Sequence, residues 1–143
     1  MADQAIHHSV LTGISTDLPV LSRAQEMLQR GASVGWKYPN VAEALKKVDE
    51  ELKEAKDAAA SGDNAHLAEE LGDLLHATTA VAMTAGIDAT QAMETTNNKW
   101  VRRFEAIEHA ARNQGVATVD LPFKEKLKAW NAAKSLPVDG QSL

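Results

Sequence analysis

Cysteine is absent from the 143-residue sequence, and aromatic side chains make up only 4% of it. Without cysteine the chain forms no disulfide, binds no metal through thiolates and has no cysteine nucleophile. This absence is typical of a reducing compartment, so we expect a cytoplasmic protein. Alanine and leucine dominate instead, which favours helices over a β-sandwich.

Long apolar runs and blocks of basic residues are also missing. No segment reaches the ~18 apolar residues that a membrane span needs, and the N-terminus lacks the basic start and apolar core of a secretory signal. The net charge is -5, without a Lys/Arg cluster of the nucleic-acid-binding type. We therefore expect neither a membrane nor a nucleic-acid polymer as a partner. A small polyanion would need help from metal ions or from a few well-placed cations.

Helical spacing of apolar residues recurs along the chain, and no segment alternates apolar and polar residues as a half-buried strand does. The predicted helices cover residues 18–33, 41–60, 65–85, 89–113 and 122–135. The short connections between them favour antiparallel neighbours, so we predict an all-α bundle of four to five helices. Residues 1–16 are expected to form a flexible arm, residues 17–135 one helical domain, and residues 136–143 a tail.

Several helix ends carry recognisable capping residues. Asn40 suits the N-cap of the helix at 41–60, with Glu43 three residues later as in a capping box. Gly62 suits its C-terminal end. Either Asp63 or Asn64 could cap the helix that follows.

Leucine-rich stripes mark the faces that we expect to be buried on the two central helices. They consist of Val41, Leu45, Val48, Leu52, Ala55 and Ala59 on the first, and of Leu67, Leu71, Leu74, Thr78 and Val81 on the second.

Two carboxylate pairs flank these stripes. At ~100° per residue, Glu51 and Glu54 lie beside the first stripe, and Glu70 and Asp73 lie beside the second. Both pairs are offset from their stripes in the same rotational direction about the helix axis. Like charges at this spacing repel each other, and nothing in folding requires that cost twice. Because Mg²⁺ and Mn²⁺ prefer carboxylate oxygens, we predict a metal site at these four residues.

The carboxylates have two other interpretations. They could be ordinary solvated side chains, with Lys47 pairing with Glu51 across one turn. A di-iron bundle would require Glu-x-x-His on two helices, whereas only Asp73 and His76 place a histidine at that spacing. Iron is therefore not expected.

A basic stretch, "TTNNKWVRRF", follows at residues 95–104. We expect Asn97 to face the buried side of its helix, and Lys99 and Arg103 to offer donors that suit phosphate oxygens. The alternative is a polar helix face with one core asparagine. Trp36 and Trp130 could each stack on a nucleobase or belong to the core.

The combined motifs resemble the MazG-type, all-α nucleoside triphosphate pyrophosphohydrolases. "EELKE" at 50–54 matches the family's E-E-x-x-E, "ELGD" at 70–73 matches the E-x-x-D that follows, and "NNKWVRRF" is similar to the family's N-x-K-F-x-R-R-F. The resemblance runs from about Leu18 to Trp130. It implies a helical catalytic domain that forms a homodimer or a pair of dimers, and that hydrolyses (d)NTPs to (d)NMP and pyrophosphate with Mg²⁺, Mn²⁺ being a substitute.

The resemblance also implies roles for individual residues. Glu51, Glu54, Glu70 and Asp73 would be the catalytic metal ligands, and the expected substrate-binding residues are Lys47, Glu50, Asn97, Lys99, Arg103 and Trp130. The helical angle aims Glu50 away from the others. Trp100 departs from the usual Phe, and His76 replaces an apolar or aromatic residue after "GDLL".

The resemblance leaves alternative functions open. The enzyme could prefer dUTP or dCTP, or act on phosphoribosyl-ATP. A non-catalytic helical interaction module, with only solvated acidic faces, is the alternative of another class. The expected role of the enzyme is nucleotide-pool house-cleaning.

Overall fold

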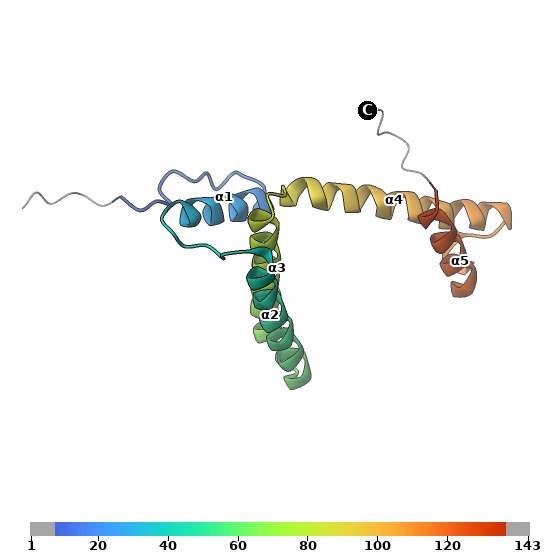
Figure 1. Cartoon of the computed structure of the whole chain (residues 1–143). Helices are drawn as coiled ribbons and strands as arrows, with labels where there is room; N and C mark the ends of the chain where they lie inside the picture. Colours follow the sequence, from blue (N-terminus) through green and yellow to red (C-terminus); the bar gives the residue numbers. More distant parts are fainter. Residues whose placement is uncertain (1–7, 137–143) are drawn as a thin grey trace, which may run out of the picture. The chain divides into compact units, whose positions relative to one another are not determined.

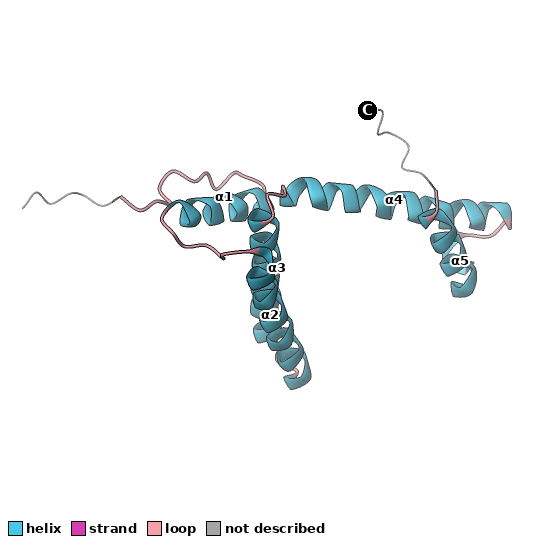
Figure 2. Ribbon diagram, in the orientation of Figure 1, coloured by secondary structure: helices cyan, strands magenta, loops and turns pink. Residues whose placement is uncertain are grey.

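The computed structural model describes residues 8–136, which form α-helices and one short 3-10 helix but no strand (Figure 2). The elements are α1 (Val20–Ser33), α2 (Val41–Ser61), α3 (Asn64–Thr84), α4 (Ala89–Asn113), η1 (Thr118–Asp120) and α5 (Phe123–Lys134). This confirms the predicted all-α class, and each predicted helix has its counterpart. Within residues 8–136, no helix is both long enough and apolar enough to cross a bilayer.

The helix ends follow the predicted capping chemistry. The Asn40 side chain accepts a hydrogen bond from the Glu43 backbone N–H at 2.9 Å, which caps α2. Gly62 ends α2 with a φ of 75°, in the left-handed region that glycine adopts without strain. Of the two candidates for the cap of α3, the structure selects Asp63, whose Oδ1 accepts from Ala65 and His66 at 3.0 Å.

The chain divides into two compact units, with the boundary between Thr90 and Gln91. The single domain at 17–135 remains a prediction. In the first unit, the tight turn after α2 makes α2 and α3 antiparallel neighbours, and α1 contacts α3 (Figure 1). Gln25 of α1 holds the turn after α3, because its side chain donates to the Ile87 carbonyl at 2.9 Å and accepts from the Ala89 N–H at 3.0 Å.

The buried faces of α2 and α3 differ from the predicted stripes. Apart from Glu51, the buried positions hold small residues: Ala44, Ala55 and Ala58 on α2, and Ala77, Thr79 and Ala80 on α3. Of these, only Ala55 belongs to a predicted stripe. Leucines of the predicted stripes are exposed instead, with Leu45 47%, Leu52 39% and Leu71 46% accessible, as is the neighbouring Leu75 at 60%. At ~100° per residue, the leucine row of α2 lies ~90° from its buried face. The apolar periodicity therefore identified a face whose leucines stay exposed among the residues that the structure describes.

The second unit has a small core of its own. Ile107 and Ala111 of α4 pack with Leu121, and Phe104 and Trp130 lie against them. This core lies along the C-terminal half of α4, whereas Met93 and Trp100 in its N-terminal half are exposed.

The predicted N-terminal arm lies partly within the described residues. Between residues 8 and 19 the chain forms turns and no helix. The Arg30 guanidinium donates to the carbonyls of Val10 and Thr12, at 3.2 and 2.6 Å, so this part is attached to α1. Residues 1–7 of the arm and 137–143 of the predicted tail lie outside the described residues.

We expect Asp63→Ala to lower the free energy of unfolding by about 1 kcal/mol, because two backbone N–H groups at the start of α3 lose their acceptor. Asn64→Ala is the matched control, since Asn64 lies inside the helix, and should change stability by less than about 0.5 kcal/mol. Urea unfolding followed by circular dichroism measures both. Equal losses in the two variants would contradict the assignment of the cap.

Candidate metal centre

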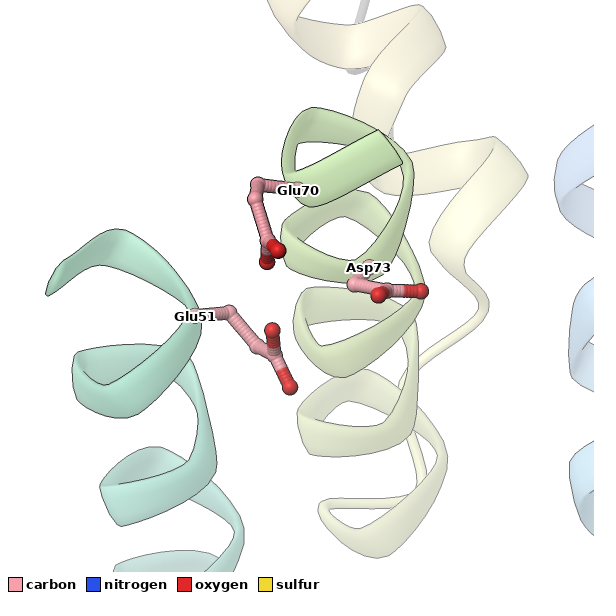
Figure 3. Close-up of side chains that lie close together, drawn as sticks. All are labelled: Glu51, Glu70 and Asp73. Atoms are coloured by element: carbon pink, nitrogen blue, oxygen red, sulfur yellow. The ribbon is translucent and has the colours of Figure 1, made fainter. Parts of the chain in front are cut away.

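Three of the four predicted metal ligands converge between α2 and α3. Glu51 projects from α2 toward α3, where Glu70 and Asp73 stand about one turn apart (Figure 3). One carboxylate oxygen from each residue lies within 4.8 Å of the other two. The tight turn between α2 and α3 makes them antiparallel neighbours, which brings Glu51 of α2 beside Glu70 and Asp73 of α3.

Glu51 lies in the middle of the buried face of α2, rather than on the flank of an apolar stripe. Its side chain is only 7% exposed, and its Oε1 accepts from Lys47 Nζ at 2.6 Å. Hydrogen bonding to Lys47 lowers the pKa of Glu51, and the same bond raises the pKa of Lys47. Glu50 is exposed and 3.4 Å from Lys47, so it points away from the cluster as the helical angle predicted.

The carboxylates of Glu51 and Glu70 share one pattern of contacts. Glu70 is 12% exposed, and its Oε1 lies 2.8 Å from His66 Nε2. The other oxygen of each, Oε2, is buried without a hydrogen-bond partner among the described residues. A buried carboxylate oxygen without a partner is costly, and a bound cation removes that cost. The residues present therefore fit a hard divalent cation such as Mg²⁺.

Glu54 is exposed and is not among the three residues whose oxygens lie closest together. The neighbouring carboxylates nevertheless change its pKa. The pKa of Glu54 is raised because its protonated form can donate a hydrogen bond to Glu51 and because the negative charge of Glu51 disfavours its ionisation, with smaller effects from burial and from the charge of Glu70. Glu54 thus borders the site on its solvent side.

The other predicted substrate-binding residues belong to the second unit, on α4 and α5. Asn97 is exposed there, so the expectation that it faces the buried side is wrong. Lys99 and Arg103 are half-buried, and the Arg103 guanidinium lies 5.6 Å from the centre of the Trp130 ring. Trp100 contacts the edge of Trp130, with ring centres 6.0 Å apart. The substrate-binding roles of these residues remain predictions.

One residue at the cluster was not predicted. His66 contacts Glu70, four residues later on α3. The spacing of the pair is visible in the sequence, because side chains at i and i+4 are neighbours on a helix.

Comparisons with known proteins agree with the resemblance. Residues 40–107 match the model of the MazG nucleotide pyrophosphohydrolase domain. The chain is 37% identical over 142 residues to a nucleoside triphosphate pyrophosphohydrolase of Escherichia coli K12, covering 95% of this chain and 52% of that protein. It is 30% identical over 117 residues to the nucleoside triphosphate pyrophosphohydrolase/pyrophosphatase MazG of Thermotoga maritima, covering 82% of this chain and 45% of that protein. The chain thus spans about half the length of these relatives.

We expect Glu54→Gln to raise the unfolding temperature of the metal-free protein at pH 7, because it removes a charge that Glu51 and Glu70 disfavour. A raised pKa means that the folded state binds the proton more tightly than the unfolded state. The wild type therefore loses stability as the pH rises from the usual carboxyl value of 4.5 through the raised folded value. The gain from the substitution should be present at pH 7 and shrink below that range.

Thermal melts in EDTA at pH 7 and near pH 4 measure this effect. Glu69→Gln is the control, since Glu69 is an exposed neighbour of Glu70. An unfolding temperature of Glu54→Gln at or below that of the wild type at pH 7 would show that the carboxylates do not repel one another.

Proposed function

We propose that this chain, whose residues 40–107 match the model of the MazG nucleotide pyrophosphohydrolase domain, hydrolyses nucleoside triphosphates to monophosphates and pyrophosphate with Mg²⁺. The supporting observation is that Glu51 and Glu70 each have a buried, unpartnered carboxylate oxygen beside Asp73. A triphosphate needs concentrated positive charge, and this acidic site could attract it only through bound cations. We place the enzyme in the cytoplasm, with house-cleaning of the nucleotide pool as its role.

The proposed reaction divides tasks among the carboxylates. Glu51, Glu70 and Asp73 would hold the ion, and Glu54 would complete the set on the solvent side. When bound, Mg²⁺ would neutralise phosphate charge and lower the pKa of a coordinated water. Because Lys47 occupies one oxygen of Glu51, the exposed Glu54 is the better acceptor for the proton of the water that attacks the α-phosphorus.

The cations complete this scheme. Lys47 holds Glu51 in its ionised form, so that the second oxygen of Glu51 is available to a cation. Lys99 and Arg103 are the residues that we propose to bind the departing pyrophosphate. Asn97 and Trp130 keep the substrate-binding roles that the family resemblance implies, and Glu50 stays a peripheral member of the site through its contact with Lys47.

We also propose that two copies of the chain associate through the exposed leucines of α2 and α3. On each helix the leucine row is rotated in the same sense from the face that contacts the other helix, and in an antiparallel pair both rows then fall on one side. Monomeric proteins rarely leave such a contiguous apolar surface exposed. A second copy offers the same helix pair, and two pairs can form a four-helix bundle with two-fold symmetry.

Incubation with dNTPs and Mg²⁺ should yield dNMP and pyrophosphate, identified by ion-exchange chromatography. Glu70→Gln and Asp73→Asn should each slow the reaction by about two orders of magnitude or more, because charge stabilisation at the reacting phosphate is lost. Glu69→Gln, the exposed neighbour, should retain activity.

Release of orthophosphate, or full activity in EDTA, would contradict this mechanism. No hydrolysis of any triphosphate with Mg²⁺ or Mn²⁺ would favour the non-catalytic helical module. A panel that includes dUTP, dCTP and phosphoribosyl-ATP separates the substrate alternatives.

Leu52→Glu combined with Leu75→Glu should convert the assembly to monomers, because two charges would then have to be buried in the interface. Sedimentation equilibrium measures the mass. Ala42→Glu is the control, since it adds the same charge at an exposed position of α2 outside the leucine row. An unchanged mass in the double variant would show that another surface forms the assembly.

A further inference from the structure

A pocket of about 710 Å³ adjoins the carboxylate cluster within the first unit. Its wall includes Trp36 and Tyr38 from the connection between α1 and α2, and His76 from α3. Glu51 and Asp73 also line it, so pocket and cluster are continuous. The volume lies within the ~300–1,000 Å³ that is usual for small-molecule sites.

Trp36 presents a large flat ring at this pocket from a fixed backbone. The backbone N–H of Trp36 donates to the Gly31 carbonyl at 2.9 Å, at the end of α1. Gly35, just before it, has a φ of 91°, a conformation that L side chains rarely adopt. The tryptophan itself is 83% exposed. An anchored but exposed indole gains little burial energy among the described residues, and it suits stacking against a planar ligand.

His76 supplies hydrogen-bonding capacity beside the apolar part of the wall. The apolar lining residues of α1 and α3 are Leu28, Ala77, Ala80 and Met83. A neutral imidazole carries one donor and one acceptor, so it can distinguish the edges of different nucleobases. His76 follows Asp73 by three residues on α3, which places a base-reading group about one helical turn from the phosphate site.

We propose that this pocket holds the nucleoside part of the substrate, with the base stacked on Trp36 and its edge read by His76, while the phosphates reach Glu51 and Asp73 through bound cations. The assignment rests on the proposed function. Lys37 and Lys47 also line the pocket, and they place positive charge where a nucleotide brings negative charge. Trp36 thus binds the base through stacking, and His76 is the residue that discriminates between bases.

Equilibrium binding tests the proposal without turnover. Isothermal titration calorimetry with Mg²⁺ uses the α,β-imido analogues of the four common dNTPs, and inorganic tripolyphosphate as a probe that lacks a nucleoside. Trp36→Ala should weaken the binding of all four analogues about tenfold, as expected for loss of base stacking. It should leave tripolyphosphate binding unchanged. Val34→Ala, at an exposed position of the same connection, is the matched control and should bind as the wild type does.

His76→Phe keeps a ring at the wall but removes its hydrogen bonds. It should change the ratio of dissociation constants between bases by about fivefold, the size expected for one net hydrogen bond. Analogue binding by Trp36→Ala within twofold of the wild type would overturn the proposal, and would be the result if the base stacked on Trp130 instead. Equal weakening of all four bases by His76→Phe would also overturn it. Because Trp36 and His76 are both exposed, the variants should melt as the wild type does.

The test separates the pocket from the reaction. If the analogues bind and depend on Trp36 while the dNTPs are not cleaved, the pyrophosphohydrolase function fails and the pocket assignment stands. If the dNTPs are cleaved and the Trp36 and His76 variants bind as the wild type does, the pocket assignment alone fails. If no nucleotide binds, both are overturned.

Discussion

The structure depends on two carboxylates, Glu51 and Glu70, that are held in the seam between α2 and α3. Alanines line this seam, so the two helices can pack closely. Acidic side chains in such a position repel each other and lose hydration. Lys47 and His66 engage one oxygen of each, and the second oxygen of each is buried without a partner. An arrangement that folding alone would disfavour is therefore best explained by a cation that binds there.

The antiparallel pairing of α2 and α3 gives the pair two different sides. Leu45, Leu52 and Leu71 lie on one side of the seam. Lys47 and Asp73 lie on the other side. The first side carries the exposed leucines that we propose as the surface for a second copy, and the second side opens into the pocket beside Trp36. The turn at Gly62 and Asp63 thus positions both surfaces, because it fixes how the two helices face each other.

Local features were predictable from the sequence because their causes are local. Asn40 and Gly62 determine the ends of α2 by capping and by backbone conformation, and the i, i+3 spacing aligned Glu70 with Asp73. The family motifs predicted that Glu70 and Asp73 share a site with Glu51 on the other helix. The buried face of α2 was predicted wrongly because periodicity shows which face is apolar, and not which neighbour covers it. Alanine contributes little to an apolar stripe, yet it allows the closest helix contact.

Other features depend on contacts that no spacing rule describes. The position of Trp36 follows from the backbone of the connection around Gly35 and from the end of α1. The exposure of Asn97 follows from how little of the N-terminal half of α4 the second unit covers. Both are tertiary properties, so the pocket could be recognised only in the folded chain.

The central claim is that Glu51, Glu70 and Asp73 bind a divalent cation together. A crystal structure of the protein in millimolar Mn²⁺, recorded with anomalous scattering, tests it most directly. We expect a manganese peak between α2 and α3, within ~2.0–2.3 Å of carboxylate oxygens from these residues. A well-ordered site without such a peak, or with Lys47 and His66 alone satisfying the carboxylates, would contradict it.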